Sequence, residues 1–543
     1  MNVKIIFEER ALWREQLSDQ GRVIASGQFG FLGKTFASQS AQQELVQQVH
    51  LRVKGLNEIL TGLQGHGSLV IDSSDCLLAV VDRVRSFPIF YSIQDQTVTI
   101  SNSARALQKE LRLFSYDGQA LLEFEMTGYV TGRDTLVPEI KQLMAGEFLF
   151  VDKLRQEIRV ERYYDYQPRA VKQKDGEALF DEYHALNKEI FQGLIDSLAG
   201  RPAWIPLSGG LDSRWILTQL LHLGYKNIVT FSYGKPGHPE VERARKVARK
   251  LNVRWIPVIY KRQDIQKLYQ SEDRKDYFKF ADGLSSIPVL NDYYALLFLR
   301  EQQQIPADAV IINGQSGDYL TGGHVPLATR EERMPSVEEL VGAIVEKHYS
   351  LWRHLKTKGN LELVAKRILR FLGISSESLL SQSDFAKYYE AWEWQERQAK
   401  FVVNGQRVYE WFGFDWRLPL WDDRLMNFWQ DMPWEKKIQQ NFQKQYLNQT
   451  NLFGVFNGYC MGPHPVKLWG TIATRLLLLY SRVMGANLNI LEKKYLSYFM
   501  NNSPYYYQKS YQEYLKDSFL HRNQFSYLVK NYLNFKEYLA VSQ

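Results

Sequence analysis

The sequence is poor in cysteine and contains no long hydrophobic run. Only two cysteines, Cys76 and Cys460, occur among 543 residues, so neither a disulfide framework nor a cysteine metal site is expected. No stretch of about 18 apolar residues is free of charge, so we expect no membrane-spanning helix. The apolar stretch after Met1 is too short for a signal peptide. We therefore expect a cytoplasmic protein.

The charge is nearly balanced, and its small surplus is concentrated at one end. The chain has 67 basic and 60 acidic residues, with 45% hydrophobic residues, which is typical of a globular protein and excludes a disordered or collagen-like chain. Residues 467–543 carry ten of the basic and four of the acidic residues, together with 11 of the 32 tyrosines. We expect this tail to pack on the body or to contact an acidic partner, such as a membrane surface or an anionic glycan. No RNA-binding motif accompanies it, so no nucleic-acid partner is expected.

The pattern of apolar residues divides the chain into three predicted parts. Residues 1–165 alternate short apolar runs with turn residues, which predicts a β-rich domain. Residues 166–466 begin with a helix and continue with alternating strands and helices, which predicts a parallel sheet. Residues 467–543 predict a basic, tyrosine-rich helical extension. The expected strands of the parallel sheet are 203–207, 228–231, 255–259 and 309–312, and a tryptophan-rich helical region is expected over 335–412.

The most informative segment follows the first expected strand of the parallel sheet. Residues 208–213 read Ser-Gly-Gly-Leu-Asp-Ser and lead into a helix. Glycines let backbone N–H groups approach an anion closely, and a helix N-terminus adds partial positive charge. Asp212 would repel a phosphate unless a cation lay between them, so the loop predicts magnesium together with nucleotide phosphates. The alternative is a plain Gly-Gly turn in which Asp212 caps the helix.

This loop resembles the pyrophosphate-binding loop of the N-type ATP-pyrophosphatases, and among them the asparagine synthetase family. Three later stretches resemble that family in order and spacing, and 82–91 and 101–107 resemble parts of its N-terminal domain. The resemblance implies an α/β and α+β architecture. An Ntn-hydrolase-like β-sandwich would precede a parallel-sheet ATP-pyrophosphatase domain of the adenine nucleotide α-hydrolase type, with helical insertions. The three later stretches are 230–240, 314–323 and 415–422.

The resemblance implies ATP and Mg²⁺ as cofactors and gives roles to individual residues. Asp212 and Asp318 would bind magnesium. Lys467 would act on the charge that develops on an acyl-adenylate, and Lys444 is the other candidate for that role. Gln315 would contact the substrate. Arg214 is unusual directly after this loop, and we expect it to bind a second anion, such as a substrate carboxylate or a phosphate, with a solvent-facing arginine at the helix start as the alternative. The nucleotide and its phosphates would be bound by Leu207, Ser208, Gly209, Gly210, Asp212, Ser213, Ser232 and Gly314.

Departures from the family pattern bear on the reaction. The family's glutaminase nucleophile is a cysteine at position 2, where this chain has Asn2. A carboxamide cannot act as that nucleophile, so we expect a degenerate glutaminase-like domain that does not hydrolyse glutamine. The family has a glutamate where this chain has Gln315, and an acidic residue where it has Tyr319. Because a glutamine cannot take a proton, the reaction needs another base or a nucleophile that arrives neutral.

The sequence therefore predicts an AMP-forming carbon–nitrogen ligase that adenylates a carboxylate and transfers the acyl group to ammonia or an amine. Relatives in this superfamily close β-lactams, cyclise lasso peptides or amidate other carboxylates. We favour a small-molecule or glycan carboxylate, including the uronic acids of surface polysaccharides. The alternatives are a lasso-peptide or β-lactam-type cyclase, or a non-catalytic nucleotide-binding scaffold. A homodimer is left open.

Some other features have a structural and a functional interpretation. Aromatic residues at helical spacing over 388–394 are expected in the core, in preference to a stacking surface for a base or sugar. His238 and His324 are expected to be loop histidines with structural hydrogen bonds, in preference to substrate contacts. A helix over 468–484 is expected to pack on the domain, in preference to lying on a membrane surface.

Overall fold

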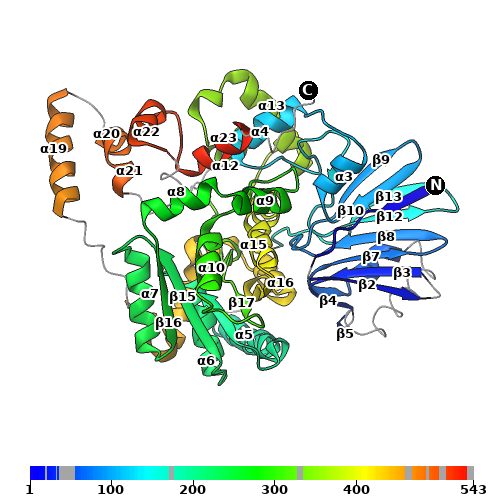
Figure 1. Cartoon of the computed structure of the whole chain (residues 1–543), viewed down its shortest axis with the longest axis horizontal. Coiled ribbons are helices and arrows are strands. Elements are labelled where there is room, and N and C mark those ends of the chain that lie inside the picture. The colour runs from blue at the N-terminus through cyan, green and yellow to red at the C-terminus, as the bar shows by residue number, and fades with distance from the viewer. Residues whose placement is uncertain are drawn as a thin grey trace.

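The computed structural model describes most of the chain. The β-rich part lies at one side, the parallel sheet with its helices in the middle, and helix α19 (Leu468–Met484) at the opposite side (Figure 1). The described residues are 1–10, 12–18, 21–31, 34–35, 55–169, 176–326, 334–458, 468–484, 488–500 and 509–534.

The N-terminal part is a sandwich of two facing sheets. Apolar side chains of both sheets, including Val70, Leu77, Val98 and Ile100, form one buried cluster between them. The expected β-sandwich is therefore confirmed. The six-stranded sheet has the order β13 (Glu157–Arg162), β12 (Glu147–Asp152), β8 (Cys76–Val81), β7 (Ser68–Asp72), β3 (Gly21–Ser26), β2 (Trp13–Ser18), and the four-stranded sheet has the order β1 (Asn2–Ile5), β10 (Thr97–Ser101), β9 (Phe90–Gln94), β11 (Lys141–Gln142).

Strand β8 is apolar throughout because both faces of its sheet are covered. All of its residues are buried. Leu77 faces the four-stranded sheet, whereas the next residue, Leu78, faces the other way and packs in a cluster with Phe29 and Phe31. Those two phenylalanines belong to a small third sheet. Its order is β5 (Lys34–Thr35), β4 (Gln28–Phe31), β6 (Leu63–His66).

A five-stranded parallel sheet forms the centre of the second part. The four strands expected from apolar runs are confirmed to within three residues at their ends. Strand β14 lies between β15 on one side and β17 on the other, so the direction of winding reverses there. In open α/β sheets such a reversal leaves a crevice at the carboxyl ends of the strands. The order is β16 (Arg254–Ile259), β15 (Ile228–Gly234), β14 (Ala203–Pro206), β17 (Val310–Ile312), β18 (Asp415–Arg417).

Helices surround this sheet and join it to the sandwich. The region expected to be helical over 335–412 is helical, and it includes a π-helical stretch, η4 (Trp394–Val402). Tyr389, Trp392 and Trp394 are almost fully buried, which confirms the core assignment of the aromatic helix. The helices of this part are α5 (Gly176–Leu198), α6 (Asp212–His222), α7 (Pro239–Lys250), α8 (Arg262–Gln270), α9 (Glu272–Ala281), α10 (Asn291–Glu301), α11 (Gly317–Leu320), α12 (Val337–His348), α13 (Lys358–Leu372), α14 (Gln382–Glu393), η5 (Val403–Gln406), α15 (Arg407–Trp411), α16 (Asp423–Asp431), α17 (Trp434–Lys437) and α18 (Asn441–Thr450).

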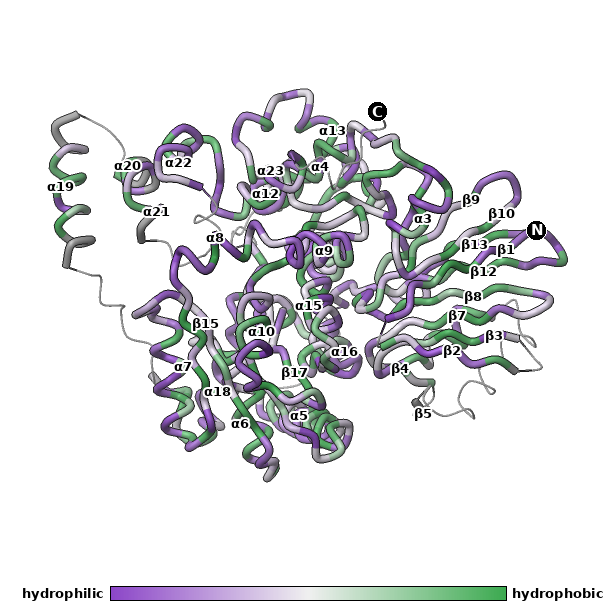
Figure 2. The backbone as a smooth tube through the Cα atoms, in the orientation of Figure 1, coloured by the Kyte–Doolittle hydropathy of each residue, from purple (hydrophilic) through white to green (hydrophobic). Residues whose placement is uncertain are grey.

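The C-terminal region divides into a helix that packs on the body and one that does not. In α23 (Phe525–Asn534), the Tyr532 ring stacks on Phe124 of α4 (Gly118–Thr127) at 5.2 Å between centroids, and its hydroxyl donates to Asp282. Helix α19 is largely apolar and stands apart from the body (Figures 1 and 2). Its exposed side chains include Leu476 (62%) and Leu479 (59%), so the expected packing of this helix on the domain is not observed.

The remaining described helices are short. None of the helices in the described ranges is both long and apolar enough to cross a lipid bilayer. The remaining helices are α2 (Leu56–Leu60), α3 (Ala104–Glu110), α20 (Leu488–Tyr495), α21 (Ser497–Met500) and α22 (Tyr511–Asp517).

Candidate functional site

Hydrogen bonds of its own two serines fix the shape of the loop between β14 and α6. The backbone N–H of Ser208 donates to Ser213 Oγ at 3.1 Å, and the two hydroxyl oxygens lie 3.1 Å apart. The backbone N–H of Gly210 donates to Ser208 Oγ at 3.1 Å. These contacts fold the loop over the N-terminus of an 11-residue helix, where backbone donors and the helix dipole favour an anion.

This loop forms one wall of a cavity of about 270 Å³ at the carboxyl ends of the parallel strands. Five segments that are distant in sequence line the cavity, one of them η5 through Gly405. The loop after β14 contributes Ser208, Gly210, Asp212 and Ser213. The other segments contribute Tyr233 at the end of β15, Asp292 at the start of α10, and Asn313, Gly314 and Gln315 after β17. The winding reversal at β14 is therefore accompanied by a pocket next to the glycine loop.

Six of the residues predicted for the site line this cavity: Ser208, Gly210, Asp212, Ser213, Gly314 and Gln315. The hydroxyl of Ser232 points elsewhere, donating to the Leu207 carbonyl at 2.6 Å and accepting from the Trp255 indole at 2.9 Å. Its neighbour Tyr233 lines the cavity in its place. Successive residues of a strand face opposite sides of the sheet, so neighbouring positions such as Ser232 and Tyr233 have their side chains on different faces.

Arg214 braces the glycine loop from behind and is not among the residues that line the cavity. Its side chain is completely buried, so it is also not the solvent-facing arginine of the alternative. The guanidinium donates to the Val455 carbonyl at 2.8 Å and to the Gly209 carbonyl at 2.9 Å. It therefore ties the glycine loop to the segment after α18 from behind, away from the cavity lining.

The two predicted metal-binding carboxylates lie close together. Asp212 accepts a hydrogen bond from the backbone N–H of Asp318, and burial together with the Asp318 charge raises the pKa of Asp212 to about 7. A Cβ at Gly317 would lie 2.7 Å from Asp212 Oδ1, so only glycine permits this close approach. Lys467 lies outside the described residues. The alternative, Lys444, donates to the Gln439 carbonyl at 2.7 Å and is exposed.

These two carboxylates fit a magnesium ion that also binds substrate phosphates. Magnesium in nucleotide enzymes is commonly held by one or two carboxylates, with the remaining ligands supplied by phosphates and water. Among the described residues no cluster of three or more acidic, histidine or cysteine side chains could hold a metal without such help. Asp212 and Asp318 would therefore be the protein ligands of the ion.

A buried carboxylate that the sequence did not reveal supports Asp318 from behind. His324 contacts Asp318 Oδ2 through Nε2 at 3.1 Å and Glu393 through Nδ1. Glu393 is completely buried and also accepts from Lys347 Nζ at 3.0 Å. Although burial lowers the pKa of a histidine, the two carboxylates raise that of His324 to about 9. His324 thus has the structural hydrogen bonds expected of a loop histidine, and they lead directly to the metal-binding pair.

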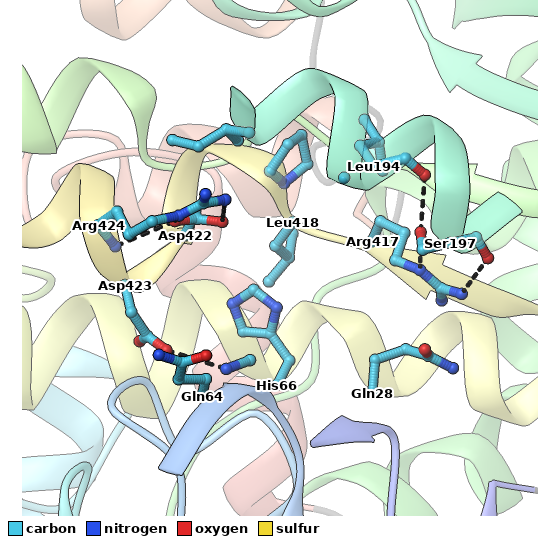
Figure 3. Close-up of a pocket in the computed structure, with 14 residues that line it drawn as sticks. Gln28, Gln64, His66, Leu194, Ser197, Arg417, Leu418, Asp422, Asp423 and Arg424 are labelled. Carbon is cyan, nitrogen blue, oxygen red and sulfur yellow. Dashed lines mark hydrogen bonds and ion pairs between the residues drawn. The ribbon is translucent and has the colours of Figure 1, made fainter. Parts of the chain in front are cut away.

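A second cavity, of about 540 Å³, lies where the sandwich meets the parallel-sheet part (Figure 3). The stretch 415–422, which resembles a stretch late in the family's synthetase domain, lies against this cavity through Arg417 and Asp422. Its charges are paired: Arg417 with Asp415 at 2.7 Å, and Asp422 with Arg424 at 3.0 Å. The imidazole of His66 points into the cavity, and burial lowers its pKa. This cavity therefore marks the junction between the two parts.

Comparison with known proteins gives a family match over part of the chain. A family model described as asparagine synthase matches residues 197–450. A search of the curated proteins finds no match.

Two solved structures show only weak likenesses. A glutamine phosphoribosylpyrophosphate amidotransferase from B. subtilis, complexed with ADP and GMP, is 11% identical with a TM-score of 0.17, over 46% of this chain and 73% of that chain. A structure described as the allosteric regulatory enzyme of purine biosynthesis is 10% identical with a TM-score of 0.17, over 45% of this chain and 62% of that chain. At such TM-scores these likenesses carry no argument about this chain.

Proposed function

We propose that the chain, whose residues 197–450 match the asparagine synthase family model, is an AMP-forming ligase that makes amide bonds. It would activate a substrate carboxylate with ATP and transfer the acyl group to ammonia or an amine. The observation that carries this proposal is the cavity at the carboxyl ends of the parallel strands. The loop hydroxyls, the helix N-terminus and two converging carboxylates all lie at that cavity or beside it.

In the first step a substrate carboxylate oxygen attacks the α-phosphorus of ATP. The bond from that phosphorus to the β-phosphate oxygen breaks, and pyrophosphate leaves. The N-terminus of α6, with the hydroxyls of Ser208 and Ser213, would bind the leaving pyrophosphate. Asp212 and Asp318 would hold magnesium, which neutralises the negative charge that builds up on the leaving group. His324 would keep the Asp318 carboxylate in place.

In the second step the nitrogen nucleophile attacks the acyl carbon, and AMP leaves. Gln315 lines the cavity, and its side-chain oxygen accepts from Gln406 at 2.9 Å. Gln315 offers hydrogen bonds to the bound acid and carries no charge. We therefore extend the proposal to a small-molecule or glycan carboxylate, including a uronic acid, as the substrate class.

We also propose that the sandwich does not hydrolyse glutamine. The cysteine in its described residues, Cys76, is buried within β8, and burial raises the pKa of its thiol. A thiol in that position supplies no accessible thiolate nucleophile. Incubation with glutamine should release no glutamate above the rate of a protein-free control. Protein-dependent release would contradict this part of the proposal.

The test of the main proposal is magnesium-dependent exchange of pyrophosphate into ATP with a panel of carboxylic acids. At least one acid should support exchange, and Asp212→Asn should lower the rate by on the order of a hundredfold, because one ligand of the ion loses its charge. The matched control is Asp276→Asn, which removes an exposed carboxylate on α9 that pairs with Lys279. Normal ATP binding without exchange for any acid would instead favour a nucleotide-binding scaffold.

A further inference from the structure

A carboxylate with no assigned role lies in the wall of the nucleotide cavity. Asp292, at the start of α10, accepts from the Tyr233 hydroxyl at 2.5 Å through Oδ1. Its Oδ2 accepts from the Tyr409 hydroxyl and lies 3.5 Å from the Asn313 amide nitrogen. Three elements of the fold, β15, α15 and the loop after β17, therefore hold this carboxylate in one orientation.

No positive charge balances this carboxylate within the part of the chain that the structure describes. Its partners there are two phenolic hydroxyls and one amide, and they form no ion pair with it. Aspartates that leave the solvent are usually paired with a cation. Burial raises the pKa of Asp292, and the hydrogen bonds from the two tyrosines act in the opposite direction by lowering it. The side chain therefore lacks the positive partner that such a carboxylate usually has.

Asp292 lines the cavity and has hydrogen-bonding capacity that its three neighbours do not use. An ionised carboxylate has about four lone-pair sites, and the three neighbours use at most three of them. A phosphate or a second carboxylate would be repelled by Asp292, so the anionic ends of ATP and of the acid must lie elsewhere in the cavity. The group that suits this wall is a cation with N–H donors.

The position of Asp292 relative to Gln315 connects it with the second step. The Asn313 side chain lies between them, because its oxygen accepts from the Gln315 backbone N–H at 2.9 Å while its nitrogen faces Asp292. The family places an acidic side chain at the position of Gln315, and a glutamine cannot take a proton. Asp292 supplies a carboxylate to the same cavity from a different element of the fold, the start of α10.

We propose that Asp292 binds the ammonium form of the acceptor amine and takes the proton that the amine must lose before it attacks. This inference rests on the proposed ligase function. One N–H bond of the alkylammonium breaks, and its proton goes to the Asp292 carboxylate. The neutral nitrogen then forms the C–N bond, the bond from the acyl carbon to the phosphate oxygen breaks, and AMP leaves with the electron pair. The second nitrogen proton passes to water.

The first test measures binding of n-butylammonium to the full chain by isothermal titration, with AMP and magnesium present. 1-Butanol serves as the uncharged probe of similar size. The wild type should bind the cation in preference to the alcohol. Asp292→Asn should weaken cation binding by about tenfold to a hundredfold, as expected for the loss of a hydrogen bond to a charged group. Asp292→Glu, which keeps the charge, should restore part of that loss.

The second test separates the two half-reactions, using an acid that is active in pyrophosphate exchange. Asp292→Asn should lose at least about tenfold more in amine-dependent AMP release than in pyrophosphate exchange. Wild-type protein that shows no preference for the cation would overturn the inference. So would a variant that loses ATP affinity while keeping cation binding, because Asp292 would then contact the nucleotide. If no acid supports exchange, the ligase proposal fails, and the titration alone decides whether this wall binds a cation.

Discussion

A buried ion pair in the π-helical stretch joins the parallel-sheet part to the sandwich. Lys400 pairs with Glu396, and both side chains are completely buried. Lys400 also donates to the carbonyls of Val130 and Gly132, while Glu396 accepts from the Gly132 N–H at 3.1 Å. Replacing Lys400 with methionine keeps most of the volume and removes the charge. Glu396 would then stay buried and keep the Gly132 N–H as a donor, but it would lose its ion-pair partner.

The expected cost follows from these contacts. Removing one member of a buried ion pair costs about 3 to 5 kcal/mol, so we expect about 4 kcal/mol for Lys400→Met. In the double variant Lys400→Met/Glu396→Gln the uncompensated charge is gone, and the glutamine oxygen still accepts from Gly132. What remains is the Val130 carbonyl without its donor, at about 1 kcal/mol, because the Gly132 carbonyl still accepts from Gln142 Nε2 at 3.2 Å. The double variant should therefore be more stable than the single variant by about 3 kcal/mol.

The assay is urea unfolding followed by far-UV circular dichroism and tryptophan fluorescence. Lys279→Met is the matched control, because Lys279 forms an exposed pair with Asp276 at 3.4 Å and its loss should cost less than about 0.5 kcal/mol. Two results would refute the reasoning. One is a Lys400→Met variant as stable as the control variant. The other is a double variant less stable than the single one, which would show that the uncompensated charge is not the cause.

Three further predictions concern the site and the junction. Gly317→Ala should displace the Asp212 carboxylate, because the new Cβ would lie 2.6 Å from Asp212 Cγ. The rate of pyrophosphate exchange should then fall by about tenfold or more. Gly342→Ala, which has open space at its Cβ, should leave the exchange rate unchanged. Arg214→Met should lower the free energy of unfolding by about 2 to 4 kcal/mol in urea denaturation, because two buried carbonyls lose a charged donor; an unchanged midpoint would contradict the bracing role. The third concerns Asp423, whose pKa burial raises to about 7. The folded protein therefore binds a proton there that the unfolded chain has already released, so wild-type stability should fall by about 1 to 3 kcal/mol between about pH 5 and pH 8 relative to Asp423→Asn. Parallel pH profiles of the two proteins would contradict this assignment.

The parallel sheet was predictable because its signals are local. Each of the four expected strands is a short apolar run between turn residues, and the loop 208–213 combines glycines, hydroxyls and an acid within six positions. Strand β18 was missed as a strand because it has only three residues, Asp415–Arg417, and two of them are charged. The segment therefore contains no apolar run from which a strand could be predicted.

The polar interior of the site was not predictable, because its partners are far apart in sequence. The two tyrosines that hold Asp292 are 59 and 117 residues away from it. Glu393 lies in an aromatic helix that was correctly expected in the core, yet its partner His324 is 69 residues away. The sequence shows which residues can donate or accept, but only the fold decides which of them meet.

The winding reversal at β14 also has a consequence for how the protein folds. The cavity needs Ser208 from one strand end, Tyr233 from the next, Asp292 from α10 and Gly405 from η5, so its walls span about 200 residues of chain. A nascent or proteolysed fragment that ends before η5 would contain the glycine loop without a closed pocket. A ligand that fits the closed pocket binds the native chain in preference to the unfolded one, and by mass action it resists global unfolding. Protection from a protease by ATP would thus report that the chain between Ser208 and Gly405 has folded, well beyond the order of one loop.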